Sequence, residues 1–314
     1  MRDGDATDGA LPARRSGAES SREPLPNEEF APAQLPHPEL RSFIKCYRLQ
    51  EVDIDTSGRW APAWTQTFLF LNYGDVYDMM PLRGPIIRGY PAMIAGIRTL
   101  PAIGARPVVR MRAVAVELQP LAAYNWLGDK VNSIVDGSLD AGSFIPEAAA
   151  LIAGIASAPF EEKCAALDKC LLPVFRPVPV RFHEGLERAM EILHRPADRS
   201  SIESRIQQAG LSSRHFRRLF KKATGVSPKL YSRILRMESV LQEFHRNPDL
   251  QYLEKVHGFY DQSHFIREFK RFTNVTPRLL IKAFKQQSIR QVHSNLEIGP
   301  DQETEPGVPG NSEP

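Results

Sequence analysis

The feature that most limits how this chain can fold is a short pattern that occurs twice in its C-terminal third. The two copies read GLSSRHFRRLFKKATGVSP and HGFYDQSHFIREFKRFTNVTP, and their corresponding histidines, His215 and His264, lie 49 residues apart. Each copy includes or follows a glycine, Gly210 or Gly258, at the end of a shorter helical segment. A helix, a tight turn and a second helix make up a helix-turn-helix unit. The repeat therefore predicts two such units in one chain.

In each copy, aromatic and cationic side chains occupy different faces of the predicted helix. Phe216 and Phe220 are spaced i, i+4 and are expected to anchor the first copy in the core. The other faces carry the cations Arg214, Arg217, Arg218 and Lys221. An α-helix is about 10–12 Å across and fits the DNA major groove, roughly 12 Å wide, where arginine pairs with guanine. We therefore predict recognition helices at about 212–222 and 261–271.

A long helix is predicted between the two copies. Apolar residues at positions 230, 234, 237, 241 and 244 form one stripe, after Ser227 as N-cap and Pro228 at the first helical position. A helix of about 18 residues spans ~27 Å, close to the ~34 Å between successive major-groove faces of DNA. We expect the two units to bind adjacent groove segments of double-stranded DNA. The alternative is a helical bundle whose arginines are only solvated.

The charge distribution favours a polyanionic partner for the C-terminal region. Residues 181–290 contain 22 basic and 11 acidic residues, a net charge of +11, whereas the whole chain has +3. The rest of the chain is therefore net acidic, at −8. A binding protein that uses the basic helices on acidic protein partners is the rival hypothesis, and a strong preference for one DNA sequence would exclude it.

These residues resemble the DNA-binding domain of the AraC/XylS family of bacterial transcription regulators. The similarity covers about residues 200–285, and the motif GF-x-DQSHF-x-R-x-FKR followed by T-x-x-P is specific. The resemblance implies two helix-turn-helix units around a long helix, with DNA, RNA polymerase and a second copy of the chain as partners. Together with the cationic pattern, it assigns DNA binding to Arg214, Arg217, Arg218, Lys221, Gln262, Ser263, His264, Arg267 and Lys270.

The sequence departs from the family pattern at two places. Where the family usually has Leu-Ala in the first helix of each unit, this chain has Arg205-Ile206 and Leu253-Glu254. A glutamate at the second packing position is expected to tilt or loosen that unit. Ile266 replaces a more usual polar residue, so we expect less base readout from the second unit.

The whole chain is predicted to be α+β, with a β-rich, barrel-like N-terminal domain followed by helices and then an all-α domain. Strands are expected within WTQTFLFLNYGD (64–75) and PVVRMRAVAVELQP (107–120), and helices follow Pro120. We expect disorder at 1–36, a regulatory domain at 37–175, a linker at 176–182, the DNA-binding domain at 183–287 and a disordered acidic tail at 288–314.

The N-terminal domain offers two interpretations. Its aromatic residues either form core or line a pocket for a small-molecule effector; they are Trp60, Trp64, Phe68, Phe70, Tyr73, Tyr90 and Tyr124. The helices after Pro120 either serve dimerisation or pack within the domain. No histidine occurs between His37 and His183, which excludes a histidine-based metal site there. We expect no metal and no cofactor.

The three cysteines bear on compartment and on a rival function. Cys46, Cys164 and Cys170 form no CxxC motif, which is typical of a reducing cytoplasm. An apolar signal segment and a membrane-spanning run are both absent, so we expect a cytoplasmic protein. The alternative function is a methyl-accepting or other cysteine-based DNA-associated enzyme. Because the Pro-Cys-His-Arg-type motif of such relatives is absent, we expect no enzyme activity.

Overall fold

The structure is a computed structural model that describes residues 33–55, 60–106, 108–179, 184–194, 206–207, 210 and 212–286. The expected tail at 288–314 and most of the expected disordered segment at 1–36 lie outside these residues. The boundary at residue 36 is corrected, because β1 (Ala33–Gln34) already pairs with the strand β2 (Ile44–Asp55). The expected linker at 176–182 is described only as far as residue 179.

Two antiparallel sheets form the N-terminal part. The first has six strands in the order β1-β2-β8-β4-β6-β9 and the second has three in the order β3-β7-β5. Beyond β1 and β2, the strands are β3 (Trp60–Ala61), β4 (Phe68–Asn72), β5 (Met79–Pro81), β6 (Ala92–Ala95), β7 (Ala102–Gly104), β8 (Val108–Leu118) and β9 (Ser138–Asp140). The predicted strand segments contain β4 and β8. The sheets do not close into a barrel, since β1 and β9 remain edges of the larger one in the described residues.

Both faces of the larger sheet pack against other apolar residues, and successive side chains of a strand join the cluster on one face and then the other. Leu69 and Leu71 of β4 pack with the helices that follow the sheet, whereas Phe70 joins a separate cluster on the opposite face. In β8, Val114 and Val116 lie on the helix side and Ala113, Ala115 on the other. Burial on both faces explains why β8 is apolar almost continuously from residue 113.

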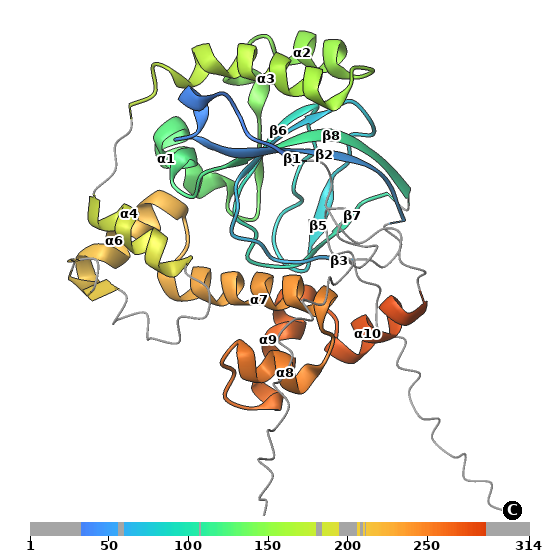
Figure 1. Cartoon of the computed structure of the whole chain (residues 1–314), viewed down its shortest axis with the longest axis vertical. Helices are drawn as coiled ribbons and strands as arrows, with labels where there is room; N and C mark the ends of the chain where they lie inside the picture. Colours follow the sequence, from blue (N-terminus) through green and yellow to red (C-terminus); the bar gives the residue numbers. More distant parts are fainter. Residues whose placement is uncertain are drawn as a thin grey trace, which may run out of the picture.

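Helices close one face of the sheet, and all of them except η1 (Pro38–Leu40) follow β8. Those after β8 are α1 (Ala122–Leu127), η2 (Gly128–Ile134), η3 (Ala141–Ser143), α2 (Ala148–Ile155) and α3 (Phe160–Phe175). Lys163 of α3 is buried and donates hydrogen bonds to the carbonyls of Ile155 and Ala156, which satisfies the C-terminal end of α2. Figure 1 shows α2 and α3 on the side of the sheet away from the C-terminal helices.

The C-terminal part is helical. It contains α4 (Glu184–Leu193), α6 (Ser213–Thr224), α7 (Pro228–Arg246), α8 (Leu250–Val256), α9 (Gln262–Thr273) and α10 (Pro277–Gln286). Figure 1 shows the long helix α7 running beneath the β-rich part, with α4 and α6 near one end and α8 to α10 near the other. Among the described residues, none of these helices is both long and apolar enough to cross a membrane.

Candidate nucleic-acid interface

Helix α6 places its aromatic side chains in the core and its cations in solvent. Phe216 and Phe220 are fully buried, in one cluster with Leu186 and Tyr231. The predicted DNA-binding residues of this helix are all exposed: Arg214, Arg217, Arg218 and Lys221. Ser212 begins the helix by accepting a hydrogen bond from the amide of His215 at 3.3 Å. The cationic face predicted from the sequence is therefore present on a capped, anchored helix.

Helix α9 repeats this arrangement. Phe265 and Phe269 are fully buried, and Asp261 caps the helix by accepting from the His264 amide at 2.6 Å. Four of the five predicted DNA-binding residues are exposed, namely Gln262, Ser263, Arg267 and Lys270. The fifth, His264, is half-buried, and its ring meets that of Phe259 edge-on at 5.6 Å.

The two units match at the level of single hydrogen bonds. Thr224 Oγ1 donates to the Phe220 carbonyl at 2.8 Å, and Thr273 Oγ1 donates to the Phe269 carbonyl at 2.7 Å. Each hydroxyl also accepts from the amide two residues on, and both threonines are buried. These bonds fix the turn that leads from each recognition helix into the next helix. The repeat seen in the sequence is thus a repeat of structure.

Left-handed residues end both recognition helices and shape both internal turns. Gly225 has φ 77° and Asn274 has φ 62°, and each is the C-cap of its helix. The turn glycines Gly210 and Gly258 have φ 73° and 66°. An L side chain is strained at such φ values, so the glycine pattern in the sequence has a direct backbone cause.

An ion pair ties α9 to α7. Arg233 of α7 donates to both carboxylate oxygens of Glu268, at 2.7 and 2.5 Å. Burial opposes ionisation of Glu268, but the hydrogen bonds and charge of Arg233 outweigh it and lower the pKa of that carboxyl. Because Arg233 neutralises Glu268, the acidic residue on α9 does not cancel the charges of Arg267 and Lys270.

The second unit has a well-filled core despite its altered sequence. Leu253 is fully buried with Phe265 and Phe272, whereas Glu254 is only half-buried. The core of this unit is thus filled with Glu254 present, and its effect on the tilt or looseness of the unit stays a prediction. In the first unit Ile206 is buried, and its neighbour Arg205 lies outside the described residues. Ile266 is half-buried, and its aliphatic side chain has no group that could form a hydrogen bond with a ligand.

The β-rich part contacts both units, which the sequence did not reveal. In the first unit, Gly225 lies against the C-terminal end of η2. An added Cβ would come within 2.3 Å of a methyl carbon of Val135, directly after η2, and within 3.4 Å of the Asn132 Cα in η2. Lys222 lies 5.8 Å from the ring centroid of Tyr124. These contacts lie near the C-terminal end of α6.

In the second unit, the amide of Ala63 donates to the Phe272 carbonyl at 2.8 Å. Thr65 donates to Glu238 of α7 through its amide and its hydroxyl, both at 2.7 Å. With these contacts in place, Arg217, Arg218 and Arg267 remain exposed.

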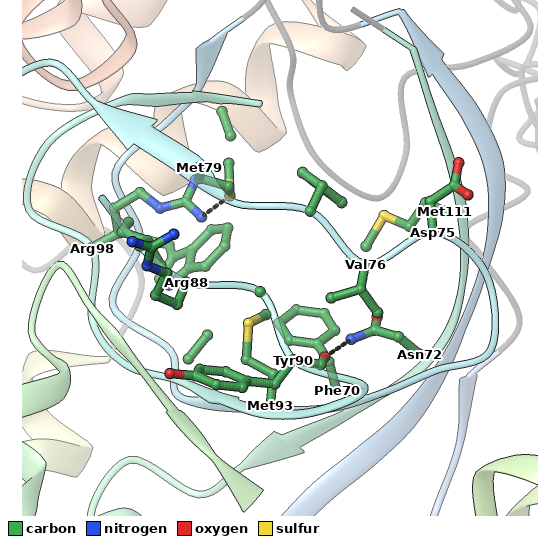
Figure 2. A pocket seen from close by; sticks show the side chains of 16 residues that line it. Phe70, Asn72, Asp75, Val76, Met79, Arg88, Tyr90, Met93, Arg98 and Met111 are labelled. Atoms are coloured by element: carbon green, nitrogen blue, oxygen red, sulfur yellow. Dashed lines mark hydrogen bonds between the residues drawn. The ribbon is translucent and has the colours of Figure 1, made fainter. Parts of the chain in front are cut away.

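A cavity of about 50 Å³ lies on the face of the large sheet opposite α2 and α3. Trp64, Phe70 and Tyr90, three of the aromatic residues considered as a pocket, line it. Tyr73 and Tyr124 instead pack against the core beneath the helices, and Phe68 packs on Trp64 and Phe70. Part of the aromatic set therefore lines a cavity (Figure 2) and part packs against other residues, while the binding of an effector stays a prediction.

No feature of the described residues organises a metal or an activated thiol. No group of three or more His, Cys, Asp or Glu side chains there is arranged to hold a metal ion. Burial and the nearby charge of Glu117 raise the pKa of Cys46 to about 11, and burial and Asp168 raise that of Cys164 to about 12. Burial also raises the pKa of Cys170. Thiols with such pKa values stay protonated at neutral pH and are poor nucleophiles.

Two helix-turn-helix units on one connecting helix, each with an exposed cationic recognition helix, define a DNA-binding protein. Comparison with known families agrees, since a family model described as a helix-turn-helix domain matches residues 206–283. Residues 206–283 therefore form a helix-turn-helix domain of the AraC type, which supports DNA binding by this part of the chain. The matched range lies within the segment that carries the resemblance in the sequence.

Solved structures with a similar arrangement include ToxT from Vibrio cholerae O395, at 10% identity and a TM-score of 0.46, covering 77% of this chain and 99% of that one. Another is ToxT from Vibrio cholerae strain SCE256 bound to an unsaturated fatty acid, at 9% identity and a TM-score of 0.45, covering 74% and 93%. No curated protein matches the sequence. Because both TM-scores are low, the assignment rests on the matched domain and the geometry above.

Proposed function

We propose that the protein reads two adjacent major-groove segments of a specific operator through α6 and α9. The observation that supports this most is the duplicated recognition helix, with the same buried phenylalanines, cap and threonine bond in each copy. Arg217, Arg218 and the region around Gln262 to Arg267 supply base contacts in this proposal. Lys221 and Lys270 neutralise phosphates and make the affinity salt-dependent.

The first experiment is selection of genomic fragments by the purified full-length protein, at about 0.15 M salt and at higher salt. We expect one compact motif that spans roughly two major-groove turns. Enrichment without a motif that vanishes as salt rises would mean that only nonspecific phosphate contacts exist, and would contradict the proposal.

Variants on the selected operator then separate base contacts from phosphate contacts. Arg218→Ala or Arg267→Ala should weaken specific binding by ~1–3 kcal/mol and relax the preference at one position. Lys221→Ala should weaken all sequences similarly and reduce the salt slope by about one. Arg83→Ala, an exposed arginine of the β-rich part, is the control of equal charge change. Unchanged affinity and preference in both arginine variants would contradict their role as readers.

We further propose that the cavity in the β-rich part binds a small-molecule effector. Its walls combine apolar and aromatic side chains with a few polar groups, as small-molecule sites do. Calorimetric titration with a metabolite mixture, fractionated by molecular class, tests this, and a cavity blocked by Ala95→Trp should lose the binding. Dimerisation of the chain and contact with RNA polymerase stay predictions from the family resemblance.

A further inference from the structure

A histidine lies three residues before a predicted DNA-binding arginine in each copy of the repeat. The pairs are His215 with Arg218 in α6 and His264 with Arg267 in α9. Residues three apart on a helix are neighbours on its surface, so each imidazole can reach the arginine that follows it. In the part of the chain that the structure describes, only the pair in α6 forms a side-chain hydrogen bond.

The hydrogen bond in α6 runs from the arginine to the histidine. Arg218 Nη2 lies 3.3 Å from His215 Nδ1. A guanidinium has no acceptor, so the imidazole nitrogen accepts, which requires a neutral ring with its hydrogen on Nε2. His215 is half-buried, whereas Arg218 is exposed. A partly buried ring thus restricts where an exposed guanidinium points.

The other side chains within one helical turn of Arg218 cannot replace this acceptor. Its neighbours at i−4, i+3 and i+4 are Arg214, Lys221 and Lys222. Arginine and lysine only donate hydrogen bonds, and like charges at these spacings repel each other. Helix α6 also contains no Asp or Glu. His215 is therefore the residue of this helix that can orient Arg218.

The equivalent pair in α9 is arranged differently. The ring of His264 meets that of Phe259 edge-on, with the centroids 5.6 Å apart. His264 Nδ1, which corresponds to the acceptor in α6, is buried and has no hydrogen-bond partner among the described residues. The residue 49 positions before Phe259 is Gly210, so the first unit has no ring at this place. The sequence thus gives His264 an aromatic neighbour that His215 lacks.

Ordering an arginine before DNA arrives should strengthen its contact with a base. A long exposed side chain loses rotamer freedom when it binds, and this loss weakens binding. For Arg218, part of the loss has already occurred in the unbound protein because His215 bonds it. The bond uses one of the five N–H donors of the guanidinium, and two of the others suffice for a bidentate contact with guanine.

We propose that His215 is a positioning residue that orients Arg218 toward one base pair, and that His264 does not act in this way on Arg267. This inference rests on the proposed reading of DNA by α6 and α9. It makes the two units unequal readers, although their helices repeat each other. The first unit holds its arginine ready, and the second orders its arginine only on binding.

A double-mutant cycle on the full-length protein tests the coupling. The variants are His215→Leu, Arg218→Ala and the two combined, and the measurement is the dissociation constant for the selected operator by fluorescence anisotropy. His215→Leu alone should weaken binding by about threefold to tenfold, since one long side chain must then be ordered on binding. In the Arg218→Ala background it should change the constant by less than about twofold.

The matched control is the same cycle in the second unit. The effects of His264→Leu and Arg267→Ala on the dissociation constant should multiply, because the two side chains share no hydrogen bond. A coupling in α9 as large as that in α6 would overturn the proposed difference between the units. The same effect of His215→Leu with and without Arg218 would overturn the positioning role.

Two further readouts separate positioning from packing. His215→Asn keeps an acceptor oxygen near the place of Nδ1, so it should bind the operator more tightly than His215→Leu does. His215→Leu should relax the preference at the same base pair as Arg218→Ala and leave the salt slope unchanged, because His215 itself neutralises no phosphate. Equal losses in the Asn and Leu variants, or a changed salt slope, would contradict the proposal.

Nitrogen NMR of the unmodified protein without DNA tests the bond itself. At about pH 8, where an ordinary imidazole is neutral, His215 should carry its hydrogen on Nε2. A hydrogen on Nδ1 would exclude the bond and overturn the proposal, whatever the variants do. A protein that shows no preference for any operator would instead count against the reading of DNA by α6 and α9. A specific binder without coupling would count against His215 alone.

Discussion

Thr273 performs the same task in the second unit that Thr224 performs in the first. Its buried hydroxyl donates to Phe269 and accepts from Val275. Thr273→Val keeps the shape but leaves these main-chain groups without the hydroxyl, so we expect about 1–2 kcal/mol lower stability of the helical domain. Urea unfolding followed by circular dichroism measures this. Thr273→Ser, which keeps the hydroxyl, should lose clearly less, and equal losses would contradict the hydrogen-bond explanation.

Glu268 should make the second unit sensitive to acid. Its pKa is lowered in the folded protein by Arg233, against the effect of burial. A lowered pKa contributes stability that is present above the ordinary value of ~4.3 and is lost as pH falls through the folded pKa. Glu268→Gln should therefore destabilise the protein at neutral pH by about 1–2 kcal/mol, and the difference from the unmodified protein should shrink on acidification. Thermal unfolding at several pH values checks it, and a difference that grows in acid would contradict the assignment.

At the scale of helices and turns, Gly225 is constrained both by its backbone conformation and by a close neighbour, whereas Gly258 is constrained only by its backbone conformation. Both have positive φ, but an added Cβ at Gly225 meets Val135, the residue directly after η2, at 2.3 Å, while at Gly258 it meets nothing within 4 Å. Each Gly→Ala change should cost about 1–2 kcal/mol from backbone strain. Only Gly225→Ala should also open the contact between α6 and η2.

Limited proteolysis and hydrogen exchange in η2 measure that opening. Faster exchange across η2 in Gly225→Ala, with Gly258→Ala unchanged there, is the expected result. The same response in both variants would mean that strain alone, and not the close approach to Val135, governs the contact.

The elements that the sequence predicted well are those with local signals. Helices were expected at about 212–222 and 261–271 and are found at Ser213–Thr224 and Gln262–Thr273, because the caps and the i, i+4 phenylalanines are local signals; the role of these helices in recognition stays a prediction. The longest strand, β2 (Ile44–Asp55), was not identified, since charged residues interrupt its apolar pattern. Its place in the sheet comes from pairing with β8, in which Tyr47 lies opposite Val116, 69 residues further on, and no local pattern encodes that pairing.

At the scale of the whole molecule, Glu238 should link domain docking to pH. Burial raises its pKa to about 7, although hydrogen bonds from Thr65 and Gln66 act in the opposite direction, and the charge of Glu117 adds to the increase. Tyr231, another neighbour on α7, stays protonated because burial raises its pKa too. Between its ordinary pKa and about pH 7, Glu238 thus carries a proton in the docked state that it loses when the domains separate.

A raised pKa contributes stability that is complete below the ordinary value and is lost as pH rises through about 7. We expect the molecule to be more compact near pH 5.5 than near pH 8, as measured by small-angle X-ray scattering. Glu238→Gln should flatten this dependence because it cannot ionise. A compactness that increases with pH in the unmodified protein, or one that Glu238→Gln leaves unchanged, would contradict the role of Glu238.

The contacts between domains were beyond prediction for a physical reason. Thr65 and Glu238 lie 173 residues apart, and each looks like an ordinary polar residue in its own segment. From the sequence, the cavity could be named only as one of two interpretations, the other being a filled core. An aromatic residue in a strand has the same local sequence pattern in both cases. Trp64 and Tyr73 show the two outcomes within a single stretch.

Gly225 also limits which β-rich domains can be combined with this helical domain. The residue that terminates the first recognition helix is also the one that lies on η2 of the other domain. At the equivalent place the second unit has Asn274, which carries a side chain at a positive φ of 62°. Exchange of the β-rich part for that of another regulator should therefore succeed only when the new domain leaves room at Gly225. The two domains are thus a matched pair, in evolution and in engineering, and not interchangeable modules.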